Sequence, residues 1–443
     1  MDMGKLPNNF LIGAATAAHQ VEGNNIYSDY WAMEQMQYTS FNEPSLDAVD
    51  HYNRYEEDIR LMAQAGLNAY RFSIEWARIE PRQGVFEETE IEHYRKVLHC
   101  CRDNGVEPIV TMHHFTSPKW LIAQGGWEKE GTIEAFAGYC RYVAEQLGDL
   151  MHYVCTINEA NMGLQVAAIA ERYKRQMAQK AAEVSRHTEA NVEGSVQVGM
   201  NFNAMMENMQ KQRAEYAALF GTDSPQTFVS GRTKEGDILV MRAHQAAKKA
   251  MKEVKPELRV GLTLSLHDIQ AQAGGEEEAA REWEEEFSHY LPYIKEDDFL
   301  GLQNYTRSLV GPEGILPNPP EAELTQMDYE FYPQALEHVI RRVHEELDIP
   351  IMVTENGIAT ADDGRRVAFI EEALKGVEKC VIDDIPVLGY LHWSLLDNFE
   401  WQKGFGMTFG LIAVDRRTQS RSPKESLKVL GSFVKEGQRT KNE

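Results

Sequence analysis

The segment Tyr153-Val-Cys-Thr-Ile-Asn-Glu159-Ala160 is a short apolar run that ends in a glutamate. A second segment of the same kind, Ile351-Met-Val-Thr-Glu355-Asn-Gly357, follows much later in the chain. Runs of this length and composition are typical of buried β-strands. A carboxylate at the end of such a strand costs free energy to desolvate unless it is paired or has a chemical role. The two segments therefore predict two carboxyl groups that face one cavity; the alternative is that each glutamate is a solvated loop residue.

On both sides of these segments, short apolar runs alternate with longer stretches of helical periodicity. Eight runs are predicted to be strands: Phe10–Ala15, Ala69–Ile74, Pro108–Met112, Tyr153–Ile157, Val260–Leu266, Phe299–Gln303, Ile351–Thr354 and Pro386–Trp393. Helices are predicted between most of them, over His51–Gly66, Glu90–Asn104, Thr132–Leu147, Ile238–Val254, Tyr332–Leu347 and Val367–Lys379. This alternation predicts a parallel sheet. Eight such units in 443 residues predict an α/β fold with one domain over residues 1–443, a (β/α)8 TIM barrel.

Polar and aromatic residues that suggest chemistry follow the predicted strands. They lie at or after the C-terminal ends, in the order Gln20, Arg71, His114, Glu159, Tyr305, Glu355 and Trp393. In a (β/α)8 barrel the C-terminal face is where active sites are built. A doubly wound open sheet is the alternative fold. It is disfavoured because no Gly-rich phosphate loop follows the first strand.

Two regions do not fit a simple count of eight units. Residues 165–232 are long for one connection, and they predict an insertion after the fourth strand that lies over the C-terminal face. This insertion holds a helical pattern, Ala167–His187, an apolar run, Val196–Phe202, and a methionine cluster for which core packing is the simplest interpretation. The segment Glu276–Glu286 holds seven glutamates and is predicted to be a solvated helix face rather than a metal site.

Composition excludes several classes of partner. The formal net charge of −24, from 45 basic and 69 acidic residues, argues against nucleic acid and anionic membrane. No run approaches the 18 or more apolar residues that span a bilayer. The five cysteines form no CxxC pattern or disulfide framework, and the N-terminal residues do not resemble a secretion signal. These observations predict a cytoplasmic protein.

Two carboxyl groups in one cavity suit the hydrolysis of a glycosidic bond. One carboxylic acid protonates the leaving oxygen and one carboxylate acts at the sugar carbon. In the retaining form of this reaction the two carboxyl groups lie roughly 5–5.5 Å apart and a covalent glycosyl-enzyme forms.

Six segments in order carry a specific resemblance. They are Phe10-Leu-Ile-Gly-Ala-Ala-Thr-Ala-Ala-His-Gln20-Val-Glu-Gly23, Tyr70-Arg-Phe-Ser-Ile-Glu-Trp76, Thr111-Met-His-His114, Thr156-Ile-Asn-Glu159, Val353-Thr-Glu-Asn-Gly357 and Trp393-Ser-Leu-Leu-Asp-Asn-Phe-Glu400-Trp401. With these segments the chain resembles glycoside hydrolase family 1, the retaining β-glycosidases. The resemblance spans nearly the whole chain except residues 165–232.

The resemblance implies a role for each matching residue. Glu159 is the implied general acid/base and Glu355 the implied nucleophile, supported by Arg71 and Tyr305. Asn158 is implied to bind the 2-hydroxyl of the sugar, and Trp393 to form the platform beneath it. The residues implied to bind the remaining hydroxyls of the sugar are Gln20, His114, Glu400 and Trp401. His114 is preferred over His113 only because it aligns.

The implied activity is an exo-acting β-glucosidase with tolerance for sugars such as galactose or fucose. Its implied partner is a small β-glycoside, with no cofactor and no metal, and a homo-oligomer stays open. A 6-phospho-β-glucosidase of the same family is the close alternative, although those enzymes usually carry Ser at position 400. From another class, a catalytically dead sugar-binding barrel is disfavoured because both glutamates are intact. Because residues 165–232 follow the strand that bears Glu159, they are also predicted to form part of a wall on the leaving-group side, with Met200, Phe202, Met205 and Met206 as candidates. The alternative is a packed segment that never meets the substrate.

Three departures from the family pattern are visible. The usual Asn-Tyr-Tyr after the sixth strand is replaced by Gln303-Asn304-Tyr305. The usual Asn-Glu-Pro is Asn158-Glu159-Ala160, and the usual loop after the fourth strand is replaced by the long segment from Gln165. The first change is expected to alter the surroundings of Glu355.

Overall fold

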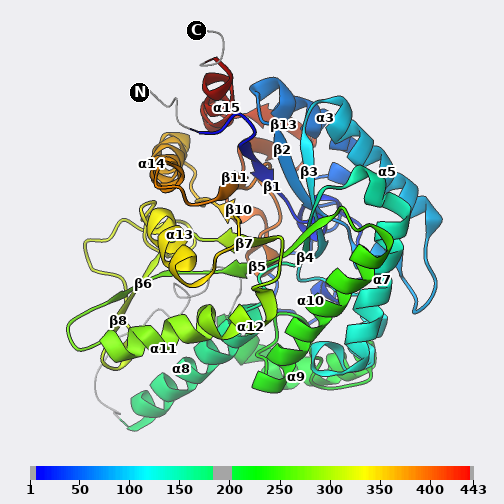
Figure 1. The fold of residues 1–443 in the computed structure, drawn as a ribbon. Helices are drawn as coiled ribbons and strands as arrows, with labels where there is room; N and C mark the ends of the chain where they lie inside the picture. The colour runs from blue at the N-terminus through cyan, green and yellow to red at the C-terminus, as the bar shows by residue number, and fades with distance from the viewer. Residues whose placement is uncertain (1–5, 183–201, 440–443) are drawn as a thin grey trace.

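The computed structural model describes residues 6–182 and 202–439. They fold around a closed barrel of eight parallel strands in the order β1-β11-β10-β7-β5-β4-β3-β2, with helices around the outside (Figure 1). The strands are β1 (Leu11–Ala15), β2 (Ala69–Ser73), β3 (Glu107–His113), β4 (Tyr153–Ile157), β5 (Arg259–Ser265), β7 (Phe299–Gln303), β10 (Ile351–Asn356) and β11 (Val387–Trp393). The predicted fold class is therefore confirmed.

Close approach of neighbouring strands depends on small residues at particular positions. Gly13 of β1 pairs with Ala69 of β2. A Cβ atom on Gly13 would lie 1.9 Å from the carbonyl oxygen of Ala69. Only glycine fits there, because real Cβ atoms do not approach so closely.

Each barrel strand leads to a helix that buries one apolar face against the sheet. These helices are α3 (His51–Ala65), α5 (Glu88–Asp103), α7 (Gly131–Leu147), α10 (Lys234–Val254), α12 (Leu291–Ile294), α13 (Ala335–Glu346), α14 (Asp363–Ile382) and α15 (Glu425–Arg439). The ends follow ordinary capping chemistry. Gly66, with φ of 106°, ends α3, and the side chain of Thr233 accepts from the Gly236 amide at the start of α10.

Several smaller elements were not predicted. They are the sheet β6 (Asp268–Ala271), β8 (Arg307–Gly311) and β9 (Gly314–Ile315), the hairpin β12 (Ile412–Asp415) and β13 (Ser420–Pro423), and the short helices α1 (Ala18–Val21), α2 (Asp29–Glu34), α4 (Trp76–Ile79) and α6 (Lys119–Ala123). These elements are too short for hydrophobic periodicity to reveal them. They follow the C-terminal ends of the barrel strands in sequence, where loops build the site.

The strand boundaries correct three details of the prediction. Strand β10 continues to Asn356, so Glu355 lies within the strand rather than just after it. Strand β3 includes His113 and leaves His114 just beyond its end. Arg71 is the third residue of β2, so its side chain reaches the site from inside the barrel rather than from a strand end.

The predicted insertion contains two long helices, α8 (Met162–Ala182) and α9 (Phe202–Phe220). The carboxylate of Glu215 on α9 accepts from the backbone N–H groups of Gln37 and Tyr38, and Gln212 donates to the Tyr38 carbonyl at 2.7 Å. Helix α9 therefore packs on the segment that follows α2. The predicted run Val196–Phe202 lies outside the described residues as far as residue 201. The same is true of the side chains of Met200, Phe202, Met205 and Met206.

The glutamate-rich segment forms α11 (Glu276–Glu286), as a helix was predicted there. The prediction of a wholly solvated face is wrong for its last turn. Glu286 is buried, and its carboxylate lies 2.8 Å from Nδ1 of His267. A buried carboxylate needs such a partner. Among the described residues, no helix is both long and apolar enough to cross a membrane.

Candidate active site

Glu159 and Glu355 lie at the same end of the barrel, after β4 and at the end of β10. Both side chains are buried, with 3% and 2% of their surface exposed. Their charges interact: the negative charge of Glu355 is one cause of the altered pKa of Glu159. The structure thus brings the two predicted carboxyl groups together.

Glu355 is held by two donors. Nη1 of Arg71 donates to one carboxylate oxygen at 2.5 Å, and the hydroxyl of Tyr305 donates to the other at 2.5 Å. Burial raises the pKa of Glu355, while Arg71 and Tyr305 both pull it down. The net direction is upward, so Arg71 limits the shift rather than lowering the pKa below its usual range. Both carboxylate oxygens are fixed in position by charge-assisted or strong hydrogen bonds.

Glu159 has the opposite environment. Its backbone N–H donates to Oγ1 of Thr263 at 2.9 Å, but its side-chain Oε2 has no hydrogen-bond partner among the described residues. Burial, followed by the charge of Glu355, raises the pKa of Glu159 well above its usual range, and Arg71 only partly opposes this. The shared proton therefore resides on Glu159, because only Glu355 has donors that stabilise the anion.

Asn158 joins Arg71 to His114 through a chain of hydrogen bonds whose direction can be derived. Arginine only donates, so the Asn158 atom 2.5 Å from Nη2 of Arg71 is its oxygen, Oδ1. The Asn158 nitrogen, Nδ2, then faces Nε2 of His114 at 3.2 Å. Burial lowers the pKa of His114 well below its usual range, so the ring is neutral. Because Nε2 must accept from Asn158, the ring proton lies on Nδ1, which has no partner among the described residues.

The aromatic residues form one stacked group. The His114 ring stacks on Trp393 at 5.7 Å and on Trp401 at 5.9 Å between centroids. His19 stacks on Trp401 with an interplanar angle of 2°. Flat apolar faces beside polar donors suit a sugar ring, which has a C–H face and polar edges.

Gln20 and Glu400 lie together on another side of the site. Nε2 of Gln20 donates to the carboxylate of Glu400 at 3.2 Å, to the Phe399 carbonyl at 2.9 Å and to Oδ1 of Asn398 at 3.2 Å. The other amide atom of Gln20, Oε1, has no partner among the described residues and is buried. The site therefore offers an acceptor from Gln20 and a carboxylate from Glu400.

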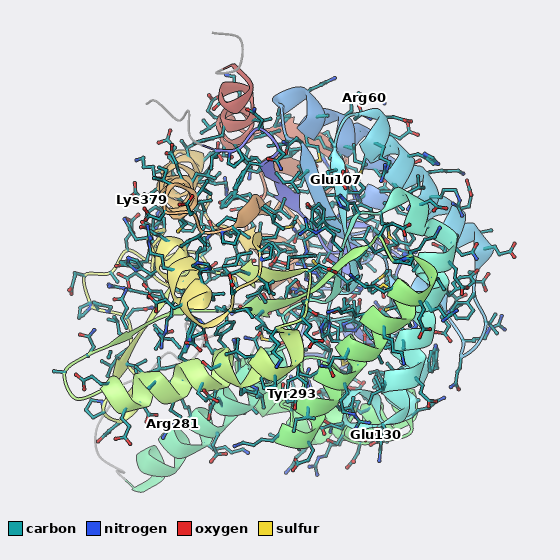
Figure 2. The ribbon with its side chains drawn as sticks, viewed as in Figure 1. Arg60, Glu107, Glu130, Arg281, Tyr293 and Lys379 are labelled. Carbon is teal, nitrogen blue, oxygen red and sulfur yellow. The ribbon has the colours of Figure 1, made fainter. Side chains whose placement is uncertain are left out.

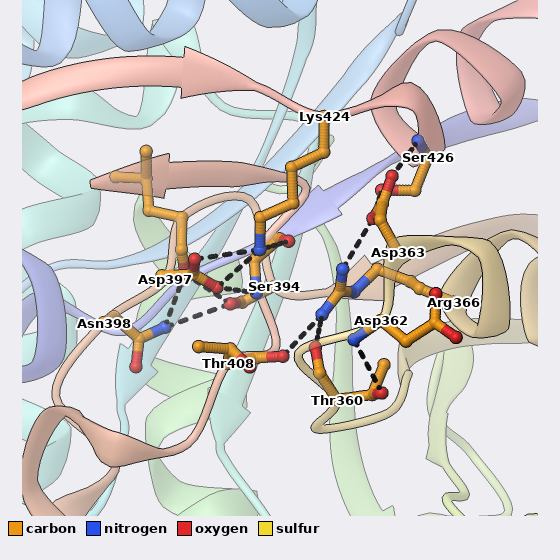
Figure 3. A network of polar contacts seen from close by, with 12 residues as sticks. Thr360, Asp362, Asp363, Arg366, Ser394, Asp397, Asn398, Thr408, Lys424 and Ser426 are labelled. Carbon is orange, nitrogen blue, oxygen red and sulfur yellow. Dashed lines mark hydrogen bonds and ion pairs between the residues drawn. The ribbon is translucent and has the colours of Figure 1, made fainter. Parts of the chain in front are cut away.

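A second layer of polar contacts holds the segment that carries Trp393 and Glu400 (Figure 3). Lys424 donates to Asp397 at 2.9 Å and to the Gly410 carbonyl at 2.8 Å, and Asn398 donates to Oγ of Ser394 at 3.0 Å. Beside it, the buried Arg366 donates to Asp363 and to two backbone carbonyls. These contacts tie the loop after β11 to α14 and to the start of α15.

The structure distinguishes His113 from His114. The ring of His113 packs edge-on against Trp127 at 4.7 Å, beside Phe228, and its Nε2 lies 3.0 Å from Oγ of Ser117. His113 is thus a core residue, whereas His114 belongs to the stacked group of the site. The alignment with the family motif had made the same choice.

One residue of the site was named in the sequence only as a departure from the family pattern, and a second was missed. Gln303 at the end of β7 donates through Nε2 to Oδ1 of Asn158 at 2.8 Å. Its departure from the family Asn was the one available signal. Tyr329 is buried 6.2 Å from Tyr305 between ring centroids, and its hydroxyl has no partner among the described residues. Nothing in the local sequence marks Tyr329, because it follows a loop of irregular composition.

Other features of the described residues do not compete with this site. A groove of about 430 Å³ lies outside the barrel between α10 and α12. Three lysines line it together with Tyr293, which is labelled in Figure 2. Two of those lysines, Lys248 and Lys252, already pair with Asp297 and Asp298. No group of three or more metal-ligating side chains is found in residues 6–182 and 202–439.

Comparison with known proteins agrees with this geometry. The model of glycosyl hydrolase family 1 matches residues 2–210 and 302–439. Beta-glucosidase A of Thermotoga maritima is 28% identical, and the alignment covers 98% of this chain and 99% of that protein. 6-phospho-beta-galactosidase 1 of Streptococcus pneumoniae is also 28% identical, with 95% and 96% covered.

Two solved structures are more similar in sequence. The apo structure of a beta-glucosidase 1317 is 42% identical with a TM-score of 0.84, and it covers 97% of this chain and 98% of its own. The beta-glycosidase BGL167 is 44% identical with a TM-score of 0.83, with 98% of both chains covered. The family model alone accounts for well over half of the residues, so the chain belongs to glycosyl hydrolase family 1.

Proposed function

We propose that this protein is a retaining exo-β-glycosidase that releases terminal β-D-glucose from β-glucosides. One observation carries the proposal. Two buried, interacting carboxyl groups share the mouth of the barrel, and only Glu355 accepts from Arg71 and Tyr305. The other, Glu159, keeps an oxygen without a partner among the described residues and has a strongly raised pKa. An anion and an acid are thus in place for double displacement.

In the first step the carboxylate of Glu355 attacks the anomeric carbon. The bond to the leaving oxygen breaks while Glu159 transfers its proton to that oxygen, and a glycosyl ester forms on Glu355. In the second step Glu159 takes a proton from water, the water oxygen attacks the same carbon, and the ester bond breaks. Two inversions give net retention of configuration.

Asn158 and His114 are the proposed donors to the sugar. Nδ2 of Asn158 and the Nδ1–H of His114 are left to donate once their mutual contact is made. Gln20 and Glu400 are the proposed acceptors for hydroxyls further round the ring, and Trp393 and Trp401 provide the apolar faces. A site built to hydrogen-bond hydroxyls discriminates strongly against analogues that lack them.

The carboxylate of Glu400 favours an unphosphorylated sugar. It is buried with 3% of its surface exposed, and a phosphate group at this place would meet a negative charge in a low-dielectric site. The similarity to a 6-phospho-beta-galactosidase keeps the phosphorylated substrate as the alternative.

The insertion is proposed to form part of the leaving-group side of the site. Helix α8 begins at Met162, three residues after Glu159, and α9 packs on the segment 37–40 that follows α2. We also propose a cytoplasmic location, because all five cysteines are free and free thiols are typical of reducing compartments.

A panel of nitrophenyl glycosides tests the proposed substrate. We expect the β-glucoside to be hydrolysed, with weaker turnover of the β-galactoside and β-fucoside and none of the α-glucoside. The matched pair of nitrophenyl β-glucoside and its 6-phosphate decides between the alternatives. Preference for the 6-phosphate would reverse the assignment, and no turnover of any glycoside would support the dead barrel.

A further inference from the structure

Gln303 lies beside Asn158 and Glu355, two residues whose orientation matters for the proposed reaction. It is the last residue of β7, and it pairs across the sheet with Glu355 of β10. The backbone N–H of the next residue, Asn304, donates to the Glu355 carbonyl at 3.2 Å. The side chain of Gln303 is completely buried. It is therefore fixed relative to Glu355 by the sheet itself.

The amide of Gln303 has a defined orientation. Its Nε2 lies 2.8 Å from Oδ1 of Asn158. That Asn158 atom is an oxygen because Arg71 donates to it, so the Gln303 atom facing it must be the nitrogen. The polar side chain of Gln303 also opposes the upward shift of the pKa of Glu355. The amide thus donates to Asn158 and also affects the protonation of Glu355.

Asn158 is restrained from two sides as a result. Arg71 approaches Oδ1 from β2, and Gln303 approaches the same atom from β7. The hydroxyl of Thr263 lies further from the same oxygen, at 3.4 Å. Because these donors hold the oxygen, rotation of the amide is opposed and Nδ2 stays directed toward His114. Loss of the short bond from Gln303 would leave Arg71 and the more distant Thr263 hydroxyl on this oxygen, which weakens the restraint on the amide.

We propose that Gln303 is a positioning residue that keeps Nδ2 of Asn158 directed at the sugar 2-hydroxyl. This inference rests on the proposed function. The inference goes beyond the proposed function because it assigns a role to a residue that differs from the usual family residue. Gln303 still carries an amide, and the nitrogen of that amide donates to Asn158. Gln303 itself does not need to touch the substrate.

The test is the dependence of turnover on the 2-hydroxyl. The readout is the ratio of kcat/KM for nitrophenyl β-glucoside to that for its 2-deoxy analogue. Gln303→Leu and Gln303→Met keep the bulk of the side chain but remove the donor. We expect each to lower the ratio by about 2- to 12-fold, the range of one lost hydrogen bond, and to move the acid limb of the pH profile upward. Gln303→Asn keeps an amide and is expected to retain more of the ratio.

A double-mutant cycle separates positioning from general damage. In the Asn158→Ala background, adding Gln303→Leu is expected to leave the ratio unchanged, because Gln303 acts on the 2-hydroxyl through Asn158. The matched control is Gln419→Leu, which removes a buried glutamine that donates to Asp47 and the Ala48 carbonyl, and its ratio should equal that of the wild type. Thermal unfolding checks that each variant is folded.

Three results would overturn the proposal: a wild-type ratio in both donor-free variants, equal losses in the Leu, Met and Asn variants, or additive effects in the cycle. Failure of the proposed function would look different. In that case the wild-type enzyme itself would not hydrolyse the glucoside, or would not distinguish it from the 2-deoxy analogue.

Discussion

At the scale of single residues, Glu159 and Glu355 have the same side chain but different surroundings. Glu355 receives a guanidinium and a phenol, and Glu159 receives neither. Burial raises the pKa of both, but the charge of Glu355 adds to the shift of Glu159 while Arg71 and Tyr305 restrain that of Glu355. The difference in environment is what allows one glutamate to be an acid and the other an anion.

Glu159→Ala should affect substrates according to their leaving group. Removal of a general acid typically costs about 10²- to 10⁴-fold, and cellobiose should show a loss in that range because its leaving alcohol needs the proton. The glycosylation step with dinitrophenyl β-glucoside should lose much less, since that phenolate leaves unaided. Pre-steady-state and steady-state rates on both substrates measure this. Equal losses on the two would contradict the assignment of Glu159.

The pH dependence of kcat/KM should be bell-shaped. Activity needs Glu355 ionised, so it is lost as the pH falls through the pKa of Glu355. It also needs Glu159 protonated, so it is lost as the pH rises through the higher pKa of Glu159. In Glu159→Gln the alkaline limb should disappear, measured on an activated aryl glucoside. An alkaline limb that persists in this variant belongs to another group.

At the scale of elements, the start of α2 carries a buried titratable group outside the catalytic pair. Asp29 is fully buried, and one carboxylate oxygen accepts from the backbone N–H groups of Tyr30 and Ser117. The other oxygen has no partner among the described residues. Burial raises the pKa of Asp29 to about 7. This carboxyl therefore holds a proton in the folded state that it loses in the unfolded state near pH 4.

Asp29→Asn should stabilise the protein increasingly as the pH rises. Between pH 4 and 7 the folded wild type binds a proton that the unfolded chain does not, so its stability falls with pH across this window. The neutral amide removes that dependence, and the gain from pH 5 to pH 8 should be on the order of 2–3 kcal/mol. Denaturant unfolding at the two pH values measures the difference.

Asp58→Asn is the control with the opposite sign. Burial raises the pKa of Asp58, but hydrogen bonds from Arg421 and His51 outweigh it and the net shift is downward. The pairing stabilises the fold above the unfolded pKa, so this variant should be destabilised at pH 8 and less so as the pH falls. A gain for Asp29→Asn that is equal at pH 5 and pH 8 would contradict the burial of an uncharged Asp29.

Shortening the connection between α8 and α9 should change the ranking of aglycones. The proposed leaving-group side of the site includes the insertion, whereas the proposed contacts to the terminal sugar, Gln20, His114 and Glu400, lie on other elements. The preference for glucose over galactose should therefore stay constant. Rates on aryl and alkyl glucosides, with circular dichroism to confirm folding, measure this. An unchanged aglycone ranking, or a shift in sugar preference, would contradict the proposal.

At the scale of the whole molecule, the barrel could be predicted because its strands and helices obey simple periodicities. Strands β4 and β7 have the predicted bounds, and the others differ by one or two residues. The closed order of strands also places Glu159 and Glu355 at one face, as parallel strands require. Long, periodic elements are determined by local sequence and burial together.

The contacts within the site could not be predicted in the same way. Gln303 and Tyr329 come from a strand end and an irregular loop, and only the closed fold brings them to Asn158 and Tyr305. The buried last turn of α11 was missed because the partner of Glu286, His267, lies in a different loop. Side chains that act through long-range partners carry no periodic signal.

The central claim is that Glu355 is the nucleophile of a retaining reaction, and rescue of Glu355→Ala by azide tests it most directly. With an activated aryl β-glucoside, the variant should lose nearly all turnover in buffer. Added azide should restore it, because the small anion occupies the place of the missing carboxylate and attacks the same face of the sugar. The account predicts α-glucosyl azide, the inverted product, by proton NMR. Wild-type turnover without azide, or rescue that yields β-glucosyl azide, would contradict it.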